Sequence, residues 1–151
     1  MIGVILMVAI TVILAAVIGG FVLGLGDSLE SAPSSQISVD PAAASAGNSG
    51  DGIVAISHNG GDPLPDGDYQ IQVQKNGTGT YKTVLEGGTA SQVDVDGDTV
   101  QIVDNVNPGE FKVGNEITIE VMGGDARAGT YSIQIIHTPS DSIIAEGEAE
   151  V

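Results

Sequence analysis

The chain has 151 residues, of which 20 are acidic and only 4 are basic, so its formal net charge is −16. A surface this acidic repels phosphate groups, which excludes nucleic acid as a partner. The chain has no cysteine, which excludes a disulfide framework and a thiolate metal site.

The charge also indicates the ionic conditions to which the protein is suited. At about 1 M salt the Debye length falls to roughly 3 Å, so repulsion between surface carboxylates is largely screened. Many acids, few lysines and small apolar residues are therefore typical of a halophilic protein. The alternative is an ordinary acidic surface that keeps the protein soluble.

Residues 1–26 contain no charged side chain, and all but one of them is apolar or glycine. The run is longer than the roughly 20 apolar residues that a helix needs to cross a bilayer. It predicts a membrane-spanning helix that is retained in the working protein and continues to about Glu30 or Ser31, before Pro33 ends it. We therefore expect a first domain, at residues 1–33, that is an apolar helix.

Small residues recur on this helix at a spacing of four. Ala16, Gly20 and Gly24 share one face, and such spacing lets the backbones of two helices approach closely. The alternative is that Gly19, Gly20, Gly24 and Gly26 mark a place where the helix bends. The sequence leaves both interpretations open.

The second expected domain, residues 34–151, is a head built from strands. Its apolar residues alternate with polar ones, which is typical of half-buried strands. Alternation or strand composition marks the segments around residues 37–39, 53–57, 69–73, 81–85, 93–95, 100–102, 117–121, 131–135 and 143–151. Short strands in this number predict an antiparallel sandwich or barrel, and hence an α+β chain with an all-β head.

Turn signals separate these segments. Asn76-Gly77 and Asp96-Gly97 are favoured pairs for tight hairpin turns, because both central residues of such turns take positive φ angles. Three glycines and two prolines between residues 60 and 67 predict a turn region there.

No set of residues in the head indicates catalysis. The two histidines, His58 and His137, fall at the ends of predicted strands and are expected to be surface or turn residues. No nucleophile-elbow sequence surrounds any serine. Carboxylates are so frequent that close pairs carry no information, so we expect neither an enzyme nor a cofactor.

The segment from Asp94 to Asp98 resembles the first half of a calcium loop. Its sixth position is Thr99 instead of glycine and its twelfth is Asn105 instead of glutamate, so the pattern fails. We expect a hairpin whose aspartates face solvent, and no metal site.

Asn76-Gly77-Thr78 matches the acceptor sequence for N-glycosylation, at a predicted turn tip where an acceptor would be accessible. The alternative is that Asn76 and Gly77 serve the turn alone.

Three segments resemble one family. IGVILMVAITVILAAVIG at residues 2–19 is similar to the N-terminal segment of haloarchaeal type IV pilins. VAISHNGGDPL at residues 54–64 and AGTYSIQIIHTPSDSIIAE at residues 128–146 resemble head strands of the same family. One departure from bacterial type IV pilins is Ile5, since those proteins carry a glutamate at position five.

The resemblance implies a structural filament subunit. Such pilins are inserted in the cytoplasmic membrane, lose a basic leader to a prepilin peptidase, and are raised into an extracellular pilus by assembly machinery. Their helices form the core of a homopolymer, their Ig-like β heads form its outer wall, and a role in surface adhesion is implied. The large apolar residues expected to form the assembly surface are Ile2, Val4, Ile5, Leu6, Val8, Ile10, Ile13, Leu14, Val17, Ile18, Phe21 and Leu25.

Two other functions fit the same arrangement of helix and head. One is a membrane-anchored surface protein with a single span and an Ig-like ligand-binding head, which would remain monomeric in detergent. The other is an archaellin, the subunit of a swimming filament. The head segments quoted above favour a pilin.

Overall fold

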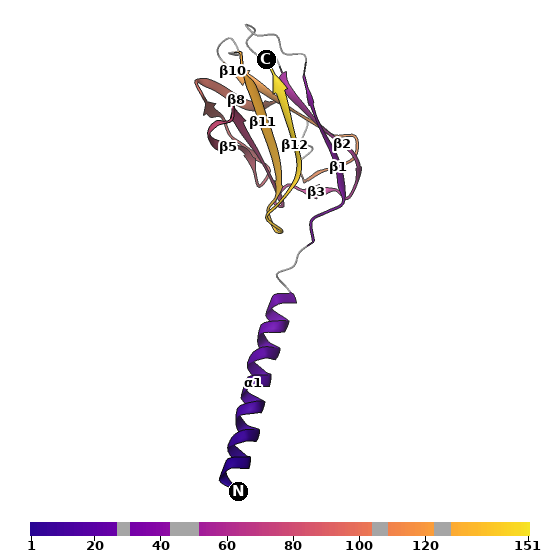
Figure 1. Cartoon of the computed structure of the whole chain (residues 1–151). Coiled ribbons are helices and arrows are strands. Elements are labelled where there is room, and N and C mark those ends of the chain that lie inside the picture. Colours follow the sequence, from indigo (N-terminus) through magenta and orange to yellow (C-terminus); the bar gives the residue numbers. More distant parts are fainter. Residues whose placement is uncertain (27–30, 43–51, 104–108, 123–127) are drawn as a thin grey trace. The chain divides into compact units, whose positions relative to one another are not determined.

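The computed structural model describes residues 1–26, 31–42, 52–103, 109–122 and 128–151 (Figure 1). The chain divides into two compact units, residues 1–31 and residues 32–151. The sequence predicts that the helix ends at Glu30 or Ser31. Residues 27–30, which lead to this end, are outside the described residues.

The first unit is the helix α1, Ile2–Gly26. Its 25 residues give a length of about 37 Å at 1.5 Å per residue, which exceeds the roughly 30 Å of a hydrocarbon layer. The Thr11 hydroxyl donates to the backbone oxygen of Val8 at 2.8 Å, so the single polar side chain of the helix is satisfied within it. Residues Ile2–Gly24 are long and apolar enough to cross a membrane.

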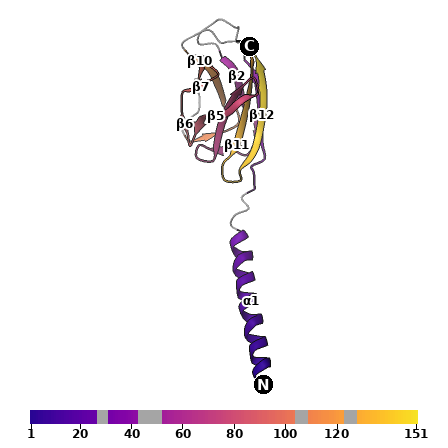
Figure 2. The same ribbon diagram turned by 60° about the vertical axis from the view of Figure 1, so that its left-hand side comes forward.

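The second unit is built from antiparallel strands (Figures 1 and 2). The first sheet has the order β1 (Ser35–Pro41), β2 (Gly52–Gly61), β10 (Glu116–Met122), β8 (Asp98–Val103), β7 (Val93–Val95). The second sheet has the order β12 (Ser142–Glu150), β11 (Thr130–His137), β4 (Tyr69–Lys75), β5 (Thr78–Glu86), β6 (Thr89–Ala90). A separate pair joins β3 (Leu64–Pro65) to β9 (Glu110–Phe111). The predicted α+β class, a helix followed by antiparallel sheets, is therefore confirmed.

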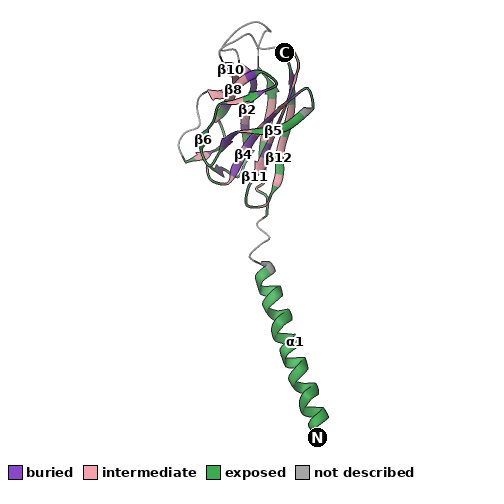
Figure 3. Cartoon of the chain, turned by 90° about the vertical axis from the view of Figure 1, so that its left-hand side faces the viewer, coloured by how far each residue is buried: buried purple, intermediate pink, exposed green. Residues whose placement is uncertain are grey.

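One hydrophobic core lies between the two five-stranded sheets. Both β4 and β11 alternate strictly between buried and half-buried residues, because successive side chains of a strand point to opposite faces. The inward residues of both sheets join one cluster, whose largest members include Tyr69, Tyr131, Phe111, Ile56 and Ile133. Figure 3 shows this burial confined to the head, while the described side chains of α1 are exposed.

The two predicted hairpin turns are confirmed. Asn76 and Gly77 have φ angles of 54° and 61°, and they connect Lys75 to its partner Thr78 in the neighbouring strand. Asp96 and Gly97 have φ angles of 53° and 84°, and they connect Val95 to Asp98. Asparagine, aspartate and glycine tolerate these left-handed conformations, which explains the sequence at both turns.

Glycine also permits one side of the sandwich to close. The strands β1 and β12 belong to different sheets but run beside each other. A Cβ atom on Gly147 of β12 would lie 2.6 Å from Cβ of Val39 in β1, closer than atoms can pack. The absence of a side chain at residue 147 therefore lets the two edge strands meet.

The turn prediction for residues 60–67 was incomplete. Leu64 and Pro65 form the short strand β3, and Leu64 is fully buried opposite Phe111. Gly60 and Gly61 belong to the end of β2, and Gly67 lies in a turn with Asp66. The frequent prolines and glycines hid a two-residue strand that has no alternation of its own.

The prediction for the two histidines was wrong, since both are buried. β2 continues through Gly61, so His58 lies inside the strand, on the inward face that Ile56 also occupies. Its Nε2 atom donates to the backbone oxygen of Asp62 at 2.9 Å, and its ring meets the Phe111 ring edge-on at 5.3 Å. His137 ends β11 on the inward face, with Nδ1 at 2.7 Å from the Ser140 hydroxyl.

The prediction that the aspartates around the Asp96-Gly97 turn face solvent was wrong for one of them. Asp94 and Asp96 are exposed, but Asp98 is only 4% exposed. The two-residue turn makes Asp98 the first residue of β8 and places it on the inward face of the sheet, as Val100 is. Its charge is met there by Lys75, at 2.6 Å between Nζ and Oδ2.

Candidate assembly interface

The predicted assembly residues of the helix whose side chains the structure describes are exposed in the single chain. Among those whose side chains are described, the exposed fraction ranges from 50% at Val17 to 77% at Ile2. Leu25 lies outside the described side chains. Burying each such side chain would contribute about 1.5–3 kcal/mol, so an apolar helix left in water is strongly unfavourable. The helix therefore requires lipid or other protein around it.

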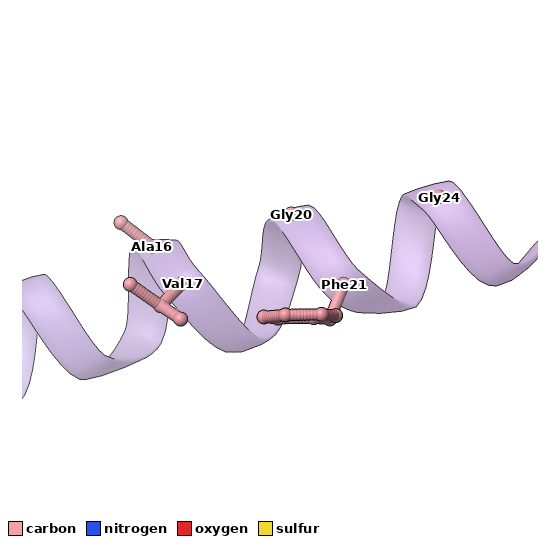
Figure 4. Close-up of a pocket in the computed structure, with 5 residues that line it drawn as sticks. All are labelled: Ala16, Val17, Gly20, Phe21 and Gly24. Carbon is pink, nitrogen blue, oxygen red and sulfur yellow. The ribbon is translucent and has the colours of Figure 1, made fainter.

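A face of small residues interrupts this apolar surface. Ala16, Val17, Gly20, Phe21 and Gly24 line a shallow hollow, in which the two glycines expose the backbone between larger side chains (Figure 4). A Cβ atom added to Gly19 or Gly20 would meet nothing within 4 Å, so nothing in the described chain requires glycine there. The helix runs continuously through these glycines to Gly26.

The described part of the helix differs from the head in charge as well as in packing. The side chains of α1 include no acid and no base, so Ile5 offers no carboxylate for a contact with another molecule. Contacts along the helix therefore depend on shape and on apolar area, both of which are insensitive to salt screening.

The head carries a polar hollow on the outer face of the second sheet. Its volume is about 310 Å³, and its polar lining comes from β5, β11 and β12: Tyr81, Ser132, Gln134, Glu146 and Glu148. The Ser132 hydroxyl donates to the Glu148 carboxylate at 3.2 Å. Within the described ranges, no three acids and histidines lie close enough together to hold a metal ion.

The candidate glycosylation residue, Asn76, is exposed at the tip of the turn between β4 and β5. Its Oδ1 atom accepts a hydrogen bond from the backbone nitrogen of Thr130 at 3.1 Å. Its Nδ2 atom, to which a glycan would be attached, lies 3.5 Å from the Asp96 carboxylate. Asn76 therefore supports the fold through its oxygen, whether or not its nitrogen is modified.

Burial changes the ionisation of one tyrosine in the head. Desolvation raises the pKa of Tyr69 well above its ordinary 10.0, and the negative charge of Asp66 raises it further. Tyr69 is fully buried, and its hydroxyl has no hydrogen-bond partner within the described part of the chain. This arrangement stabilises the neutral phenol and offers no catalytic partner for it.

Residues 1–37 match the family model described as the N-terminal segment of archaeal type IV pilins. The matched residues include all of α1 and the beginning of β1. The match includes the uncharged helix α1, and it supports a pilin-like role for this part of the chain.

A second comparison found similarity to an uncharacterised protein of Archaeoglobus fulgidus. The two sequences are 53% identical over 64 residues, which cover 42% of this chain and 41% of that protein. The match therefore spans about two fifths of each chain, and it leaves the activity of the whole pilin-like protein to be inferred from its structure.

Sequence reasoning missed the buried pair of Lys75 and Asp98, which joins the two sheets of the head. Lys75 does continue the inward alternation of Tyr69, Ile71 and Val73, and this signal could have revealed a buried lysine. A buried lysine requires a partner, but no local pattern identifies the partner among 20 acids.

Proposed function

We propose that this protein is a structural subunit of an extracellular archaeal type IV pilus, and that it is not an enzyme. Its helix, residues 1–33, is the assembly element, and its head, residues 34–151, forms the outer wall of a homopolymer. The observation that carries this proposal is a pilin-type helix that has no charged side chain and whose described large apolar side chains are at least half exposed.

The assembly step exchanges one apolar environment for another. Before assembly the helix lies in the cytoplasmic membrane, and in the pilus it lies among identical helices. Lipid tails and helix surfaces are similarly apolar, so the exchange changes the hydrophobic free energy little. Close packing of helices and contacts between heads then favour the polymer. A prepilin peptidase and energy-consuming assembly machinery would prepare and lift the subunit.

The hollow along Ala16, Gly20 and Gly24 is proposed as the place where a neighbouring helix packs. Without Cβ atoms at the two glycines, two helix axes can approach closely, and dispersion contacts along the backbone replace side-chain packing. The large apolar residues on the other faces would fill the spaces between helices. The continuous course of α1 supports packing over a bend at this position.

The head is proposed to face solvent at the outside of the pilus. Residues 34–151 contain 18 of the 20 acids and all 4 bases, so a net charge of −14 belongs to this outer part. Such a wall suits a high-salt medium, where screening removes repulsion between neighbouring heads. The polar hollow at Tyr81, Gln134 and Glu148 is a candidate contact point for surface adhesion. Asn76 is the proposed point of glycan attachment.

Filaments from the native cells test this proposal. Sheared extracellular material is imaged by electron microscopy and its protein is sequenced, first from cells that carry the intact gene and then from cells that carry Ile13→Asp. Ile13→Leu is the matched control, since it keeps the apolar character. A charge at a helix centre costs about 2.5–3.5 kcal/mol on insertion into a membrane.

We expect filaments that contain this chain with the intact gene and with Ile13→Leu, and none with Ile13→Asp. Protein that remains monomeric in detergent and never enters filaments would instead identify a membrane-anchored surface protein. Filaments that rotate and drive swimming would identify an archaellin.

A further inference from the structure

A buried lysine and a buried aspartate link the two sheets of the head. Lys75 is the last residue of β4 in the second sheet, and Asp98 is the first residue of β8 in the first sheet. Their exposed fractions are 1% and 4%, and Lys75 Nζ lies 2.6 Å from Asp98 Oδ2. An amine and a carboxyl group are therefore held in contact inside the sandwich.

We propose that Lys75 and Asp98 condense to an intramolecular amide bond that joins the two sheets covalently. The proposal depends only on the head and holds whether or not the chain forms a pilus. It gives a cysteine-free chain a covalent link that needs no oxidant.

Neighbouring groups fix both reactants. The Tyr131 hydroxyl donates to Asp98 Oδ2 at 2.5 Å, and Lys75 Nζ lies 5.1 Å from the centre of the Tyr131 ring. A Cβ atom on Gly129 would lie 2.8 Å from Lys75 Cε, so the Gly129 backbone packs directly against the lysine side chain. Well-oriented intramolecular reactions reach effective concentrations of roughly 10⁵–10⁸ M, far beyond the concentrations of free amines and acids in solution.

The reaction begins with a proton transfer between the two groups. An amine attacks a carboxyl carbon only when the nitrogen has its lone pair, which requires transfer of a proton from the ammonium to the carboxylate. In water the two ions are strongly favoured because both are hydrated. The contact between Nζ and the Asp98 carboxylate brings the two partners of that proton transfer together.

The reaction then balances with water as its other product. The Nζ lone pair attacks Cγ of the protonated Asp98, and the Tyr131 hydroxyl stabilises the negative charge that develops on the oxygen it contacts. The bond from Cγ to the protonated Oδ1 of Asp98 breaks, and this hydroxyl group leaves as water with a proton from Nζ. The product is an Nζ–Cγ amide with one N–H, whose carbonyl oxygen accepts the hydrogen bond from Tyr131.

Peptide mass spectrometry of the full chain, taken from its native membranes or filaments and then denatured, tests the proposal. Trypsin does not cleave after an acylated lysine, so we expect complete loss of cleavage after Lys75, with cleavage after Lys82 and Lys112 preserved. A branched peptide should join the Lys75 segment to the Asp98 segment. Its mass should be lower than that of the two separate segments by one water.

Two variants provide matched comparisons. Lys75→Arg keeps the positive charge and cannot form the amide, so its peptides should have their full mass. Lys82→Arg changes an exposed lysine and should retain the branched peptide. The peptide masses of the wild-type chain test the proposal even if Lys75→Arg fails to fold. Cleavage after Lys75 in the denatured wild-type chain, with no branched peptide, would overturn the proposal and leave an ion pair.

Discussion

The helix and the head use apolar residues in opposite ways. In the head, apolar side chains alternate with polar ones and are buried by the chain's own second sheet, so Ile56 and Ile133 are at most 1% exposed. In the helix, apolar side chains point in all directions, and the large ones that are described are at least half exposed. The head therefore completes its own fold, whereas the helix needs surroundings that the single chain does not supply.

Removal of residues 1–31 is expected to have the largest effect. Because the core of the head receives nothing from the helix, residues 32–151 should fold alone and remain monomeric in buffered high salt, whereas the full chain should require detergent. Size-exclusion chromatography and circular dichroism measure both properties. Aggregation of the shortened chain, or a loss of its β signal, would contradict the self-sufficiency of the head.

A core substitution should act on the head and leave the helix unaffected. Ile133→Ala removes a fully buried side chain and should lower the free energy of unfolding by about 2–5 kcal/mol. Ile143→Ala, at a residue 53% exposed, is the matched control and should change it by less than about 0.5 kcal/mol. Denaturant titration of residues 32–151 measures both. Equal effects at the two positions would contradict the position of the core.

Substitution at Gly20 should have the reverse pattern, with an effect on assembly alone. Gly20→Leu improves intrinsic helix propensity by about 0.8–1 kcal/mol, yet it fills the hollow beside Ala16 and Gly24 and should reduce filament yield. Gly3→Leu adds the same group on a different face, and filament yield should stay near wild type. Electron microscopy of sheared material gives the yields.

A second substitution separates close packing from bending at the same residue. Gly20→Ala adds only a methyl group and should be largely tolerated if helices pack against this face. It should impair assembly as severely as Gly20→Leu if the glycine is needed for a bend, and that result would reject the packing interpretation.

The smallest expected effect concerns Tyr69 and alkaline pH. Burial raises the pKa of this phenol in the folded state. As the pH rises above 10, the unfolded chain therefore loses the phenol proton while the folded chain keeps it. The stability contributed by the neutral phenol is complete below pH 10 and is lost as the pH rises, by up to about 1.4 kcal/mol per pH unit.

Tyr69→Phe should therefore flatten the fall in the free energy of unfolding above pH 10, as measured by denaturant titration at several pH values. Tyr81→Phe, at a half-buried tyrosine, is the control and should leave the slope unchanged. An unaltered slope in Tyr69→Phe would show that other groups govern alkaline unfolding.

Features that depend on local pattern could be predicted from the sequence. The uncharged run predicts α1, alternation predicts β4, β10 and β11, and Asn76-Gly77 and Asp96-Gly97 specify their turns. The short strands β3, β6 and β9 escaped prediction because two residues carry no period.

Features that depend on distant partners could not be predicted. Asp98 and His58 are buried because of where their strands begin and end and because Lys75 and Phe111 meet them across the fold. The proposed assembly interface on α1 depends on a distant partner to an even greater degree. Its residues are evident from the sequence, but the surface that covers Gly20 belongs to another molecule in the proposed pilus.

The central claim is that α1 lies in the dry core of a polymer while the head remains in solvent. Because the chain has no cysteine, single cysteines can report on each region: Val12→Cys in the helix and Glu148→Cys in the head. In purified, lipid-free filaments, a water-soluble maleimide should label Glu148→Cys and fail to label Val12→Cys until the filaments are dissociated. Equal labelling of both cysteines in intact filaments would contradict the claim.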